Sequence, residues 1–165
     1  MSKVNGFEFE IDKKVVLTNT EVGAFQTSAS VVKLASVFIP ANTFAANDIC
    51  VIQYRCEKSN GLAVGNFNFY WNTSDTLTSA TQLSTRANTA TLQYTAGYRR
   101  IAIRTSNNNT LISAVSYSQD TDYSNWLNTN PSTVSINWTV DSYLLLGGNS
   151  GGSTPVRCIS LNISN

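Results

Sequence analysis

The dominant pattern along the chain is an alternation of apolar and polar residues with a period of two. Near the start, Phe7, Phe9 and Ile11 alternate with acidic residues, and such alternation places successive side chains on opposite faces of a half-buried strand. The same pattern, or a short apolar run, predicts further strands at residues 31–39, 48–56, 66–71, 89–94, 98–105, 110–117, 132–138, 142–146 and 156–163. We therefore expect about ten short strands.

Residues that favour turns separate most of these segments. Pro40 ends the run 31–39, and Ala96-Gly97 predicts a tight turn between the strands 89–94 and 98–105. The glycine-rich stretch 147–155 is interpreted as a long hairpin loop before the last strand. Residues 122–128 are the single helix candidate, at most two turns long. Many short strands with turn signals predict an all-β fold, a jelly-roll β-sandwich of about 8–10 antiparallel strands with two four-stranded sheets. Residues 1–165 are expected to form one domain.

Composition removes several classes of function. The chain has no histidine, which excludes histidine bases and histidine metal ligands. Its net charge of +1 lacks the basic excess of nucleic-acid-binding proteins. No stretch approaches the roughly 20 apolar residues of a membrane span, and the first residues lack the apolar core of a signal peptide. Synthesis in a cytoplasm, with no nucleic acid and no membrane as partner, is therefore expected.

Charge is scarce and small polar residues are abundant. Charged residues make up 13% of the chain, against about 25% in typical domains, whereas there are 20 Ser, 19 Thr and 19 Asn residues. A sheet with such an outer face can pack against another copy without desolvating ions, which is the costly part of burial. This composition favours a homo-oligomer.

The three cysteines are interpreted as buried small hydrophobic residues. Cys50 and Cys56 lie six residues apart on one predicted strand, roughly 20 Å, which is too far for a disulfide. Cys158 faces one or the other from a neighbouring strand. The spacing has no CxxC pair, so no zinc site is expected.

Candidate chemistry gathers around a predicted loop that contains Asp120, Asp122, Tyr123 and Trp126. Aromatic rings beside carboxylates can bind sugars, which offer apolar faces and hydroxyl groups. A glycosidase or esterase that uses Asp120 and Asp122, or calcium binding by the same pair, is a weaker reading. No nucleophile motif or phosphate-binding loop is present, so we expect no catalytic residues, no cofactor and no metal site.

Six segments follow one another in a recognisable order: "VVLTNT" (15–20), "VVKLASVFIPANTFAANDICVIQYRCEK" (31–58), "FNFYWNTSDTLTSATQLST" (67–85), "YRRIAIRT" (98–105), "VSINWTVDSYLLL" (134–146) and "VRCISLNI" (156–163). Together they resemble a family of jelly-roll domains in structural proteins of tailed bacteriophages. The most characteristic pieces are residues 39–43 with 47–48, residues 70–74 and residues 136–141. Such domains occur in head fibres, capsid decoration proteins and tail-fibre tips, including those of crAss-like phages.

The resemblance implies a non-enzymatic virion protein, usually trimeric, that decorates the particle or attaches to the host. Because the chain has no stem repeat, a small head-fibre or capsid decoration protein is favoured. Its expected partners are its own copies in a homotrimer, the capsid or another virion protein, and a bacterial surface glycan. Residues 1–14, with Phe7, Phe9 and Ile11, form the predicted virion-attachment segment. The alternative is a carbohydrate-binding receptor-binding protein of a tail fibre, with Asp120, Asp122, Tyr123 and Trp126 as its ligand site.

Overall fold

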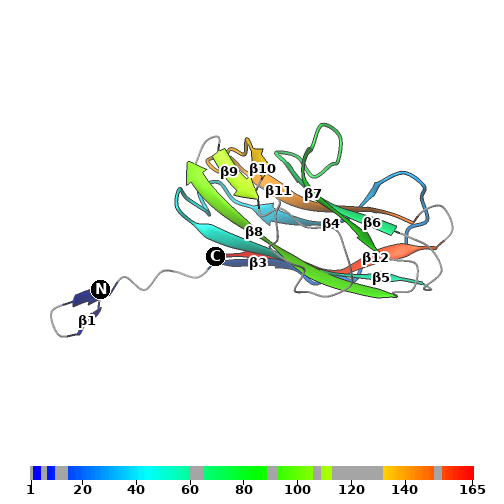
Figure 1. The fold of residues 1–165 in the computed structure, drawn as a ribbon, viewed down its shortest axis with the longest axis horizontal. Helices are drawn as coiled ribbons and strands as arrows, with labels where there is room; N and C mark the ends of the chain where they lie inside the picture. The colour runs from blue at the N-terminus through cyan, green and yellow to red at the C-terminus, as the bar shows by residue number, and fades with distance from the viewer. Residues whose placement is uncertain are drawn as a thin grey trace.

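The computed structural model describes residues 2–4, 7–9, 15–59, 65–88, 93–105, 109–112, 132–150 and 154–165. The elements in these ranges are twelve β-strands, and all their pairings are antiparallel. Ten strands belong to two large sheets that face each other (Figure 1). The predicted all-β class is confirmed, and the two antiparallel sheets are consistent with a β-sandwich.

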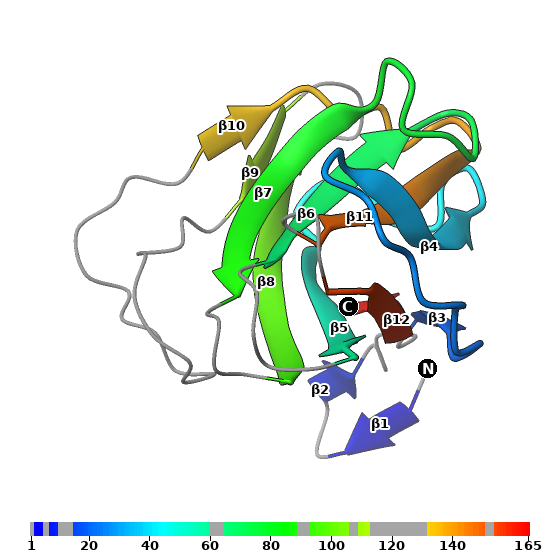
Figure 2. The same ribbon diagram turned by 90° about the vertical axis from the view of Figure 1, so that its right-hand side faces the viewer.

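The larger sheet has six strands in the order β10-β9-β8-β5-β12-β3, and the smaller sheet has four in the order β4-β11-β6-β7. The end-on view of Figure 2 shows the two layers curving around a common interior. The strands of the six-stranded sheet are β3 (Val16–Asn19), β5 (Ile49–Lys58), β8 (Tyr94–Thr105), β9 (Asn109–Ile112), β10 (Ser132–Val134) and β12 (Val156–Ser164). Those of the four-stranded sheet are β4 (Val32–Ile39), β6 (Gly65–Asn72), β7 (Thr81–Asn88) and β11 (Ser142–Asn149).

The core lies between the sheets and is built by alternation along each strand. On β5, for example, Ile52 and Tyr54 are buried while Gln53 and Arg55 are exposed. The ring of Tyr54 meets that of Phe69 on β6 edge to face, with centroids 5.0 Å apart, which is a favourable aromatic geometry. The period-two pattern of the sequence thus indicates which side chains point between the sheets.

The predicted turn at Ala96-Gly97 is wrong. Both residues lie inside β8, which runs unbroken from Tyr94 to Thr105 and pairs along its first nine residues with β5. Gly97 stands opposite Tyr54 in this pairing. Glycine is uncommon inside a strand, yet β8 continues through it. Most of the predicted strand 89–94 lies outside the described residues, and its last residue, Tyr94, is the first residue of β8.

The interpretation of residues 147–155 as a hairpin loop is also wrong. Gly147, Gly148 and Asn149 belong to β11, which lies in the four-stranded sheet, whereas β12 lies in the six-stranded sheet. Consecutive strands in different sheets cannot form a hairpin, so this connection crosses between the layers. The glycines continue the strand because other side chains occupy the space above them, as described below.

Other predictions are confirmed in part. The predicted strand 132–138 is regular only over Ser132–Val134, although Ile136 and Trp138 are buried as expected. The predicted strand in residues 7–12 appears as β2 (Phe7–Phe9), which pairs with β1 (Ser2–Val4) in a two-stranded sheet of its own. Ile11 and the helix candidate 122–128 lie outside the described residues.

Candidate functional site

One end of the four-stranded sheet brings together the three sequence pieces that are most characteristic of the resemblance. The last residue of β4, Ile39, pairs with the first residue of β11, Ser142, and the last residue of β6, Asn72, pairs with Tyr143. The pieces at residues 39–43, 70–74 and 136–141 therefore meet at the same end of the sheet, although the first and last are about a hundred positions apart in the sequence.

The corner after β4 is held by backbone hydrogen bonds to the segment before β11. The Asn42 N–H donates to the Trp138 carbonyl oxygen at 2.9 Å, and the Ala41 N–H donates to the Asp141 carboxylate at 2.8 Å. Asn42 has a φ of 59°, a conformation that asparagine tolerates better than most residues. The Trp138 ring packs edge to face on Phe44. Asn42 thus lies in the turn after β4, and Trp138 lies in the core.

Asn72 organises the loop after β6. Its side-chain amide donates to the carbonyl oxygens of Thr76 and Thr78 at 2.8 and 3.0 Å, and its carbonyl accepts the Thr73 N–H. Farther along the loop, the Asp75 carboxylate accepts from the Lys33 ammonium at 2.7 Å. The loop is thereby tied to β4 as well as to β6, across the intervening strand β11.

This loop lies over the outer face of the four-stranded sheet. Leu145, which points outward from β11, is fully buried. A Cβ atom added at Gly147 would lie 2.8 Å from Val31, 2.9 Å from Tyr70 and 3.4 Å from Leu77. The outer face of this sheet around Leu145 and Gly147 is therefore covered by a second, smaller apolar layer.

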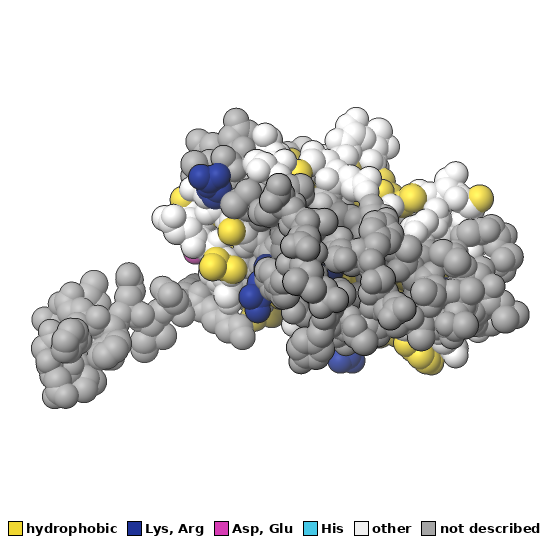
Figure 3. All heavy atoms as spheres, viewed as in Figure 1, with side chains coloured by type: hydrophobic (Ala, Val, Ile, Leu, Met, Phe, Trp, Pro, Cys, Tyr) yellow, Lys and Arg dark blue, Asp and Glu magenta, His cyan; other side chains and the backbone are white. Residues whose placement is uncertain are grey.

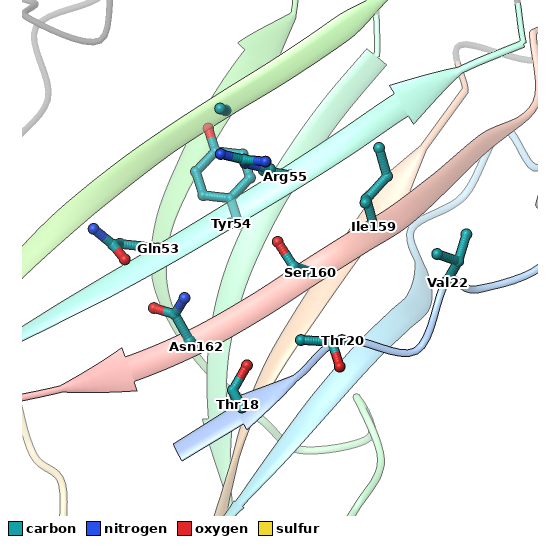
Figure 4. A pocket seen from close by; sticks show the side chains of 10 residues that line it. Thr18, Thr20, Val22, Gln53, Tyr54, Arg55, Ile159, Ser160 and Asn162 are labelled. Atoms are coloured by element: carbon teal, nitrogen blue, oxygen red, sulfur yellow. The ribbon is translucent and has the colours of Figure 1, made fainter. Parts of the chain in front are cut away.

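The outer face of the six-stranded sheet differs, because its centre holds a hollow of about 620 Å³ across β3, β12, β5 and β8. Volumes of roughly 300 to 1,000 Å³ are typical of ligand sites. Figure 4 shows the labelled side chains on neighbouring strands. We name this site the outer hollow, and its lining residues are Thr18, Thr20, Val22, Gln53, Tyr54, Arg55, Ala96, Ile159, Ser160 and Asn162.

Cross-strand pairing places these polar side chains in rows. Thr18 on β3 pairs with Asn162 on β12, and Asn162 pairs with Gln53 on β5. In the next row, Ser160 pairs with Arg55. In the described part of the chain no hydrogen bond or ion pair engages these five side chains with another protein group. Their donors and acceptors are thus available to a ligand.

One pair of charges beside the outer hollow is neutralised within the protein. Beyond Arg55 along the same face, Arg157 donates to the Glu57 carboxylate from Nε at 2.7 Å and from Nη2 at 2.6 Å. The Arg157 guanidinium also lies 4.3 Å from the centre of the Phe25 ring. Arg55 is the single charged residue among the described residues that line the outer hollow.

The three cysteines lie inside the sandwich and are free thiols. Cys158 on β12 pairs directly with Cys56 on β5, which decides between the two partners that the sequence left open. Burial raises the pKa of the Cys56 thiol, and a hydrogen bond with Cys158 acts in the same direction. Burial raises the pKa of the Cys50 thiol to about 12, and the charge of Asp48 adds to this effect. Buried thiols with a raised pKa are poor nucleophiles.

The residues that the sequence singled out as a site do not form the outer hollow. Asp120, Asp122, Tyr123 and Trp126 lie outside the described residues, as does Ile11. Phe7 and Phe9 are described as strand residues of β2, and their role in virion attachment stays a prediction.

Sequence reasoning missed the residues of the outer hollow. The alternation in residues 48–56 and 156–163 already places Gln53, Arg55 and Asn162 on the face opposite the apolar residues. What the sequence lacks is the pairing of β12 with both β5 and β3, which brings these side chains together.

Among the described residues, no group of three or more Asp, Glu, Cys or His side chains is placed to hold a metal ion. The described part also contains no helix that is long and apolar enough to cross a membrane. Searches against protein-family models, curated proteins and solved structures found no match to this chain.

Proposed function

We propose that this chain is a non-enzymatic structural protein of a tailed-bacteriophage virion, a head-fibre or capsid decoration protein exposed on the particle surface. The observation that carries the proposal is the meeting of residues 39–43, 70–74 and 136–141 at one end of the four-stranded sheet. These are the pieces on which the resemblance to phage structural proteins rests most heavily. Because these pieces contact one another, the resemblance concerns one connected corner of the fold and not three unrelated stretches of sequence.

The strand order supports a jelly-roll topology for this protein. In chain order, β3, β5, β8 and β12 lie in the larger sheet and β4, β6, β7 and β11 in the smaller one. The chain therefore passes repeatedly from one sheet to the other, giving the orders β3-β12-β5-β8 and β4-β11-β6-β7. Two four-stranded sheets connected by such crossovers are characteristic of jelly rolls. On this interpretation, β9 and β10 extend the sheet beyond β8.

Two neighbouring edge strands support assembly as a homotrimer. β3 and β4 are the edge strands of the two sheets on the same side of the molecule, joined by a hydrogen bond from the Asn19 side chain to the Ser36 carbonyl oxygen. Val16 and Phe38 on these strands are 54% and 46% exposed. Monomeric proteins usually protect such edges with charges, so an edge with exposed apolar residues favours contact with another copy.

The trimer is tested by size-exclusion chromatography with light scattering. The expected mass is about three times the 18.0 kDa of one chain, and Val16→Lys and Phe38→Lys are expected to lower it because they place charges in the contact. A matched control is Val140→Lys, which changes an exposed apolar residue outside β3 and β4. A mass of one chain would overturn the trimer.

The virion role is tested by labelling. Antibodies against the purified chain, with gold conjugates, are expected to mark the surface of phage particles purified from a lysate in which the gene is expressed. Labelling confined to unassembled protein would contradict the proposal. Adding chains lacking residues 1–14 to particles that lack the protein tests attachment: loss of binding is expected, and retained binding would contradict the role given to Phe7, Phe9 and Ile11.

A further inference from the structure

The outer hollow has the shape and chemistry of a ligand site, and this observation goes beyond a structural role in a particle. It lies on the face of the six-stranded sheet that no described loop closes, whereas the matching face of the other sheet is covered down to a fully buried Leu145. The hollow spans four strands, so its walls are held by ladder hydrogen bonds. A rigid sheet holds side chains in fixed positions, which reduces the entropy lost when a ligand binds.

The lining is matched to a hydroxyl-rich molecule. Thr18, Ser160, Asn162 and Gln53 offer hydroxyl and carboxamide groups that both donate and accept hydrogen bonds, and none of them is engaged within the described part of the chain. Figure 4 shows these side chains on the adjacent strands β3, β12 and β5, and all four line the outer hollow. Sugar hydroxyls likewise donate and accept, so a row of such groups can bind successive hydroxyls of one oligosaccharide.

An apolar wall accompanies the polar rows. Val22 is 55% exposed at one side of the hollow, and Ile159 lies between it and Ser160 in the close-up (Figure 4). Pyranose rings have apolar C–H faces as well as hydroxyl edges. Burial of the exposed surface of Val22 against such a face contributes to binding in proportion to the area covered.

Arg55 adds a preference for negative charge. Its guanidinium is exposed and has no hydrogen-bond or ion-pair partner in the described residues, whereas the nearby Arg157 is bound to Glu57. A guanidinium presents a planar fork of donors that fits a carboxylate or phosphate. Figure 3 shows Lys and Arg side chains as separate patches among the described residues of the face in view.

We propose that the outer hollow binds an acidic oligosaccharide, with Arg55 paired to its negative group and Gln53, Ser160 and Asn162 bonded to its hydroxyls. Charge complementarity selects this occupant over a neutral glycan, since Arg55 is the single charged residue among the described lining. The proposal stands on the hollow alone. It differs from a sugar site at Tyr123 and Trp126, which share no residue with it.

The proposal is tested first with a glycan array that holds neutral, uronate-containing and phosphorylated oligosaccharides of matched length. Binding to either acidic class, and not to the neutral one, is expected, and it should weaken as sodium chloride is raised. Binding to neutral glycans alone, or to none of the three classes, would overturn the proposal. The acidic oligosaccharide with the strongest signal is then titrated calorimetrically into the full chain.

The variants Arg55→Gln and Asn162→Ala locate the site. Arg55→Gln is expected to weaken binding about tenfold to a hundredfold, the effect of losing a hydrogen-bonded ion pair. Asn162→Ala should weaken it several-fold. The matched control is Arg104→Gln, an exposed arginine on β8 outside the hollow lining, eight residues from Ala96 and so roughly 26 Å along the strand. Its affinity is expected to stay within twofold of the original.

Two results would contradict the assignment of the ligand site to the outer hollow. If Arg55→Gln and Asn162→Ala both bind the acidic glycan as tightly as the unaltered chain, the ligand binds elsewhere. If Arg55→Gln instead lowers the mass measured by light scattering, the outer hollow is a contact between copies of the chain. Both residues are solvent-facing on a sheet whose core they do not enter, so circular dichroism spectra should be unchanged and the variants remain folded.

Discussion

Replacing Gly147 by alanine tests the closed outer face of the four-stranded sheet. The new Cβ atom would lie 2.8 Å from Val31 Cγ1, 2.9 Å from Tyr70 Cε2 and 3.4 Å from Leu77 Cδ1, whereas carbon atoms in contact prefer about 3.5 to 4.0 Å. Relief requires movement in at least two of three segments, because the contacts come from the entry to β4, from β6 and from the loop after β6.

Overpacking of this kind typically costs about 1–3 kcal/mol of unfolding free energy. For a domain of this size, each 1 kcal/mol lowers Tm by about 2–4 °C, so Gly147→Ala should unfold between about 2 and 12 °C lower. Urea unfolding followed by circular dichroism gives the free energy directly. Hydrogen exchange should also quicken in residues 73–80, since the loop must lift to admit the methyl group.

The double variant Val31→Ala/Gly147→Ala provides the control. Val31→Ala removes the atom nearest the new Cβ, so the two substitutions together should cost less than the sum of their separate costs. Such non-additivity is expected for residues in contact. A Gly147→Ala protein as stable as the original, or strictly additive costs, would refute the packing argument for this face.

Three further predictions concern charges and a thiol. Glu57→Gln should lower the urea midpoint more than Asp75→Asn, because the Glu57 side chain is 11% exposed and its replacement leaves the partly buried Arg157 without an opposite charge, whereas the Asp75 side chain is 42% exposed; equal effects would contradict this. Asp141→Ala should cost about 1 kcal/mol in chemical unfolding by removing the acceptor at the corner after β4, and a change near zero would show that the corner is held without it. Above pH 9.0 the Cys50 thiol ionises in the unfolded chain but stays protonated in the fold up to about pH 12, so stability should fall by up to about 1.4 kcal/mol per pH unit, and Cys50→Ala should flatten the fall; parallel curves for both proteins would refute it.

The strands with clear alternation were predictable from the sequence. β4, β5, β6 and β12 appear where the period-two pattern and apolar runs place them, because one buried face forces apolar residues to every second position. The burial of Ile136 and Trp138 was predictable for the same reason.

Glycine misled the prediction in both places where the strands were wrongly ended. Glycine has a low propensity for strands, so Gly97 and Gly147 predict breaks between strands. In the fold, Gly97 pairs with Tyr54, and Gly147 lies under Val31 and Tyr70. At Gly147 a side chain would meet a large neighbour that uses the space. That neighbour comes from another strand, so a rule based on nearby residues cannot detect it.

The outer hollow could not be predicted from the sequence for a related reason. Its residues come from β3, β5, β8 and β12, and each looks like an ordinary outward-facing position on its own strand. The sequence drew attention to aromatic and acidic residues in one loop, because such side chains can bind sugars. A site made of Thr, Ser, Asn and Gln has no such signal where Ser, Thr and Asn are the commonest polar residues.

The strand pairing shows what individual charged residues do in a chain that has few of them. In the described part of the chain the carboxylates of Glu57, Asp75 and Asp141 each accept a hydrogen bond from another segment, so these charges serve the fold. Arg55 is an exposed charge with no such role, and it stands beside unbonded polar groups over a hollow. In a protein that keeps few ions and engages most of them internally, a charge left free at a concave surface points toward a ligand of opposite sign. The scarcity of charge that favours packing between copies thus also draws attention to Arg55, and so to the outer hollow as the site where another molecule binds.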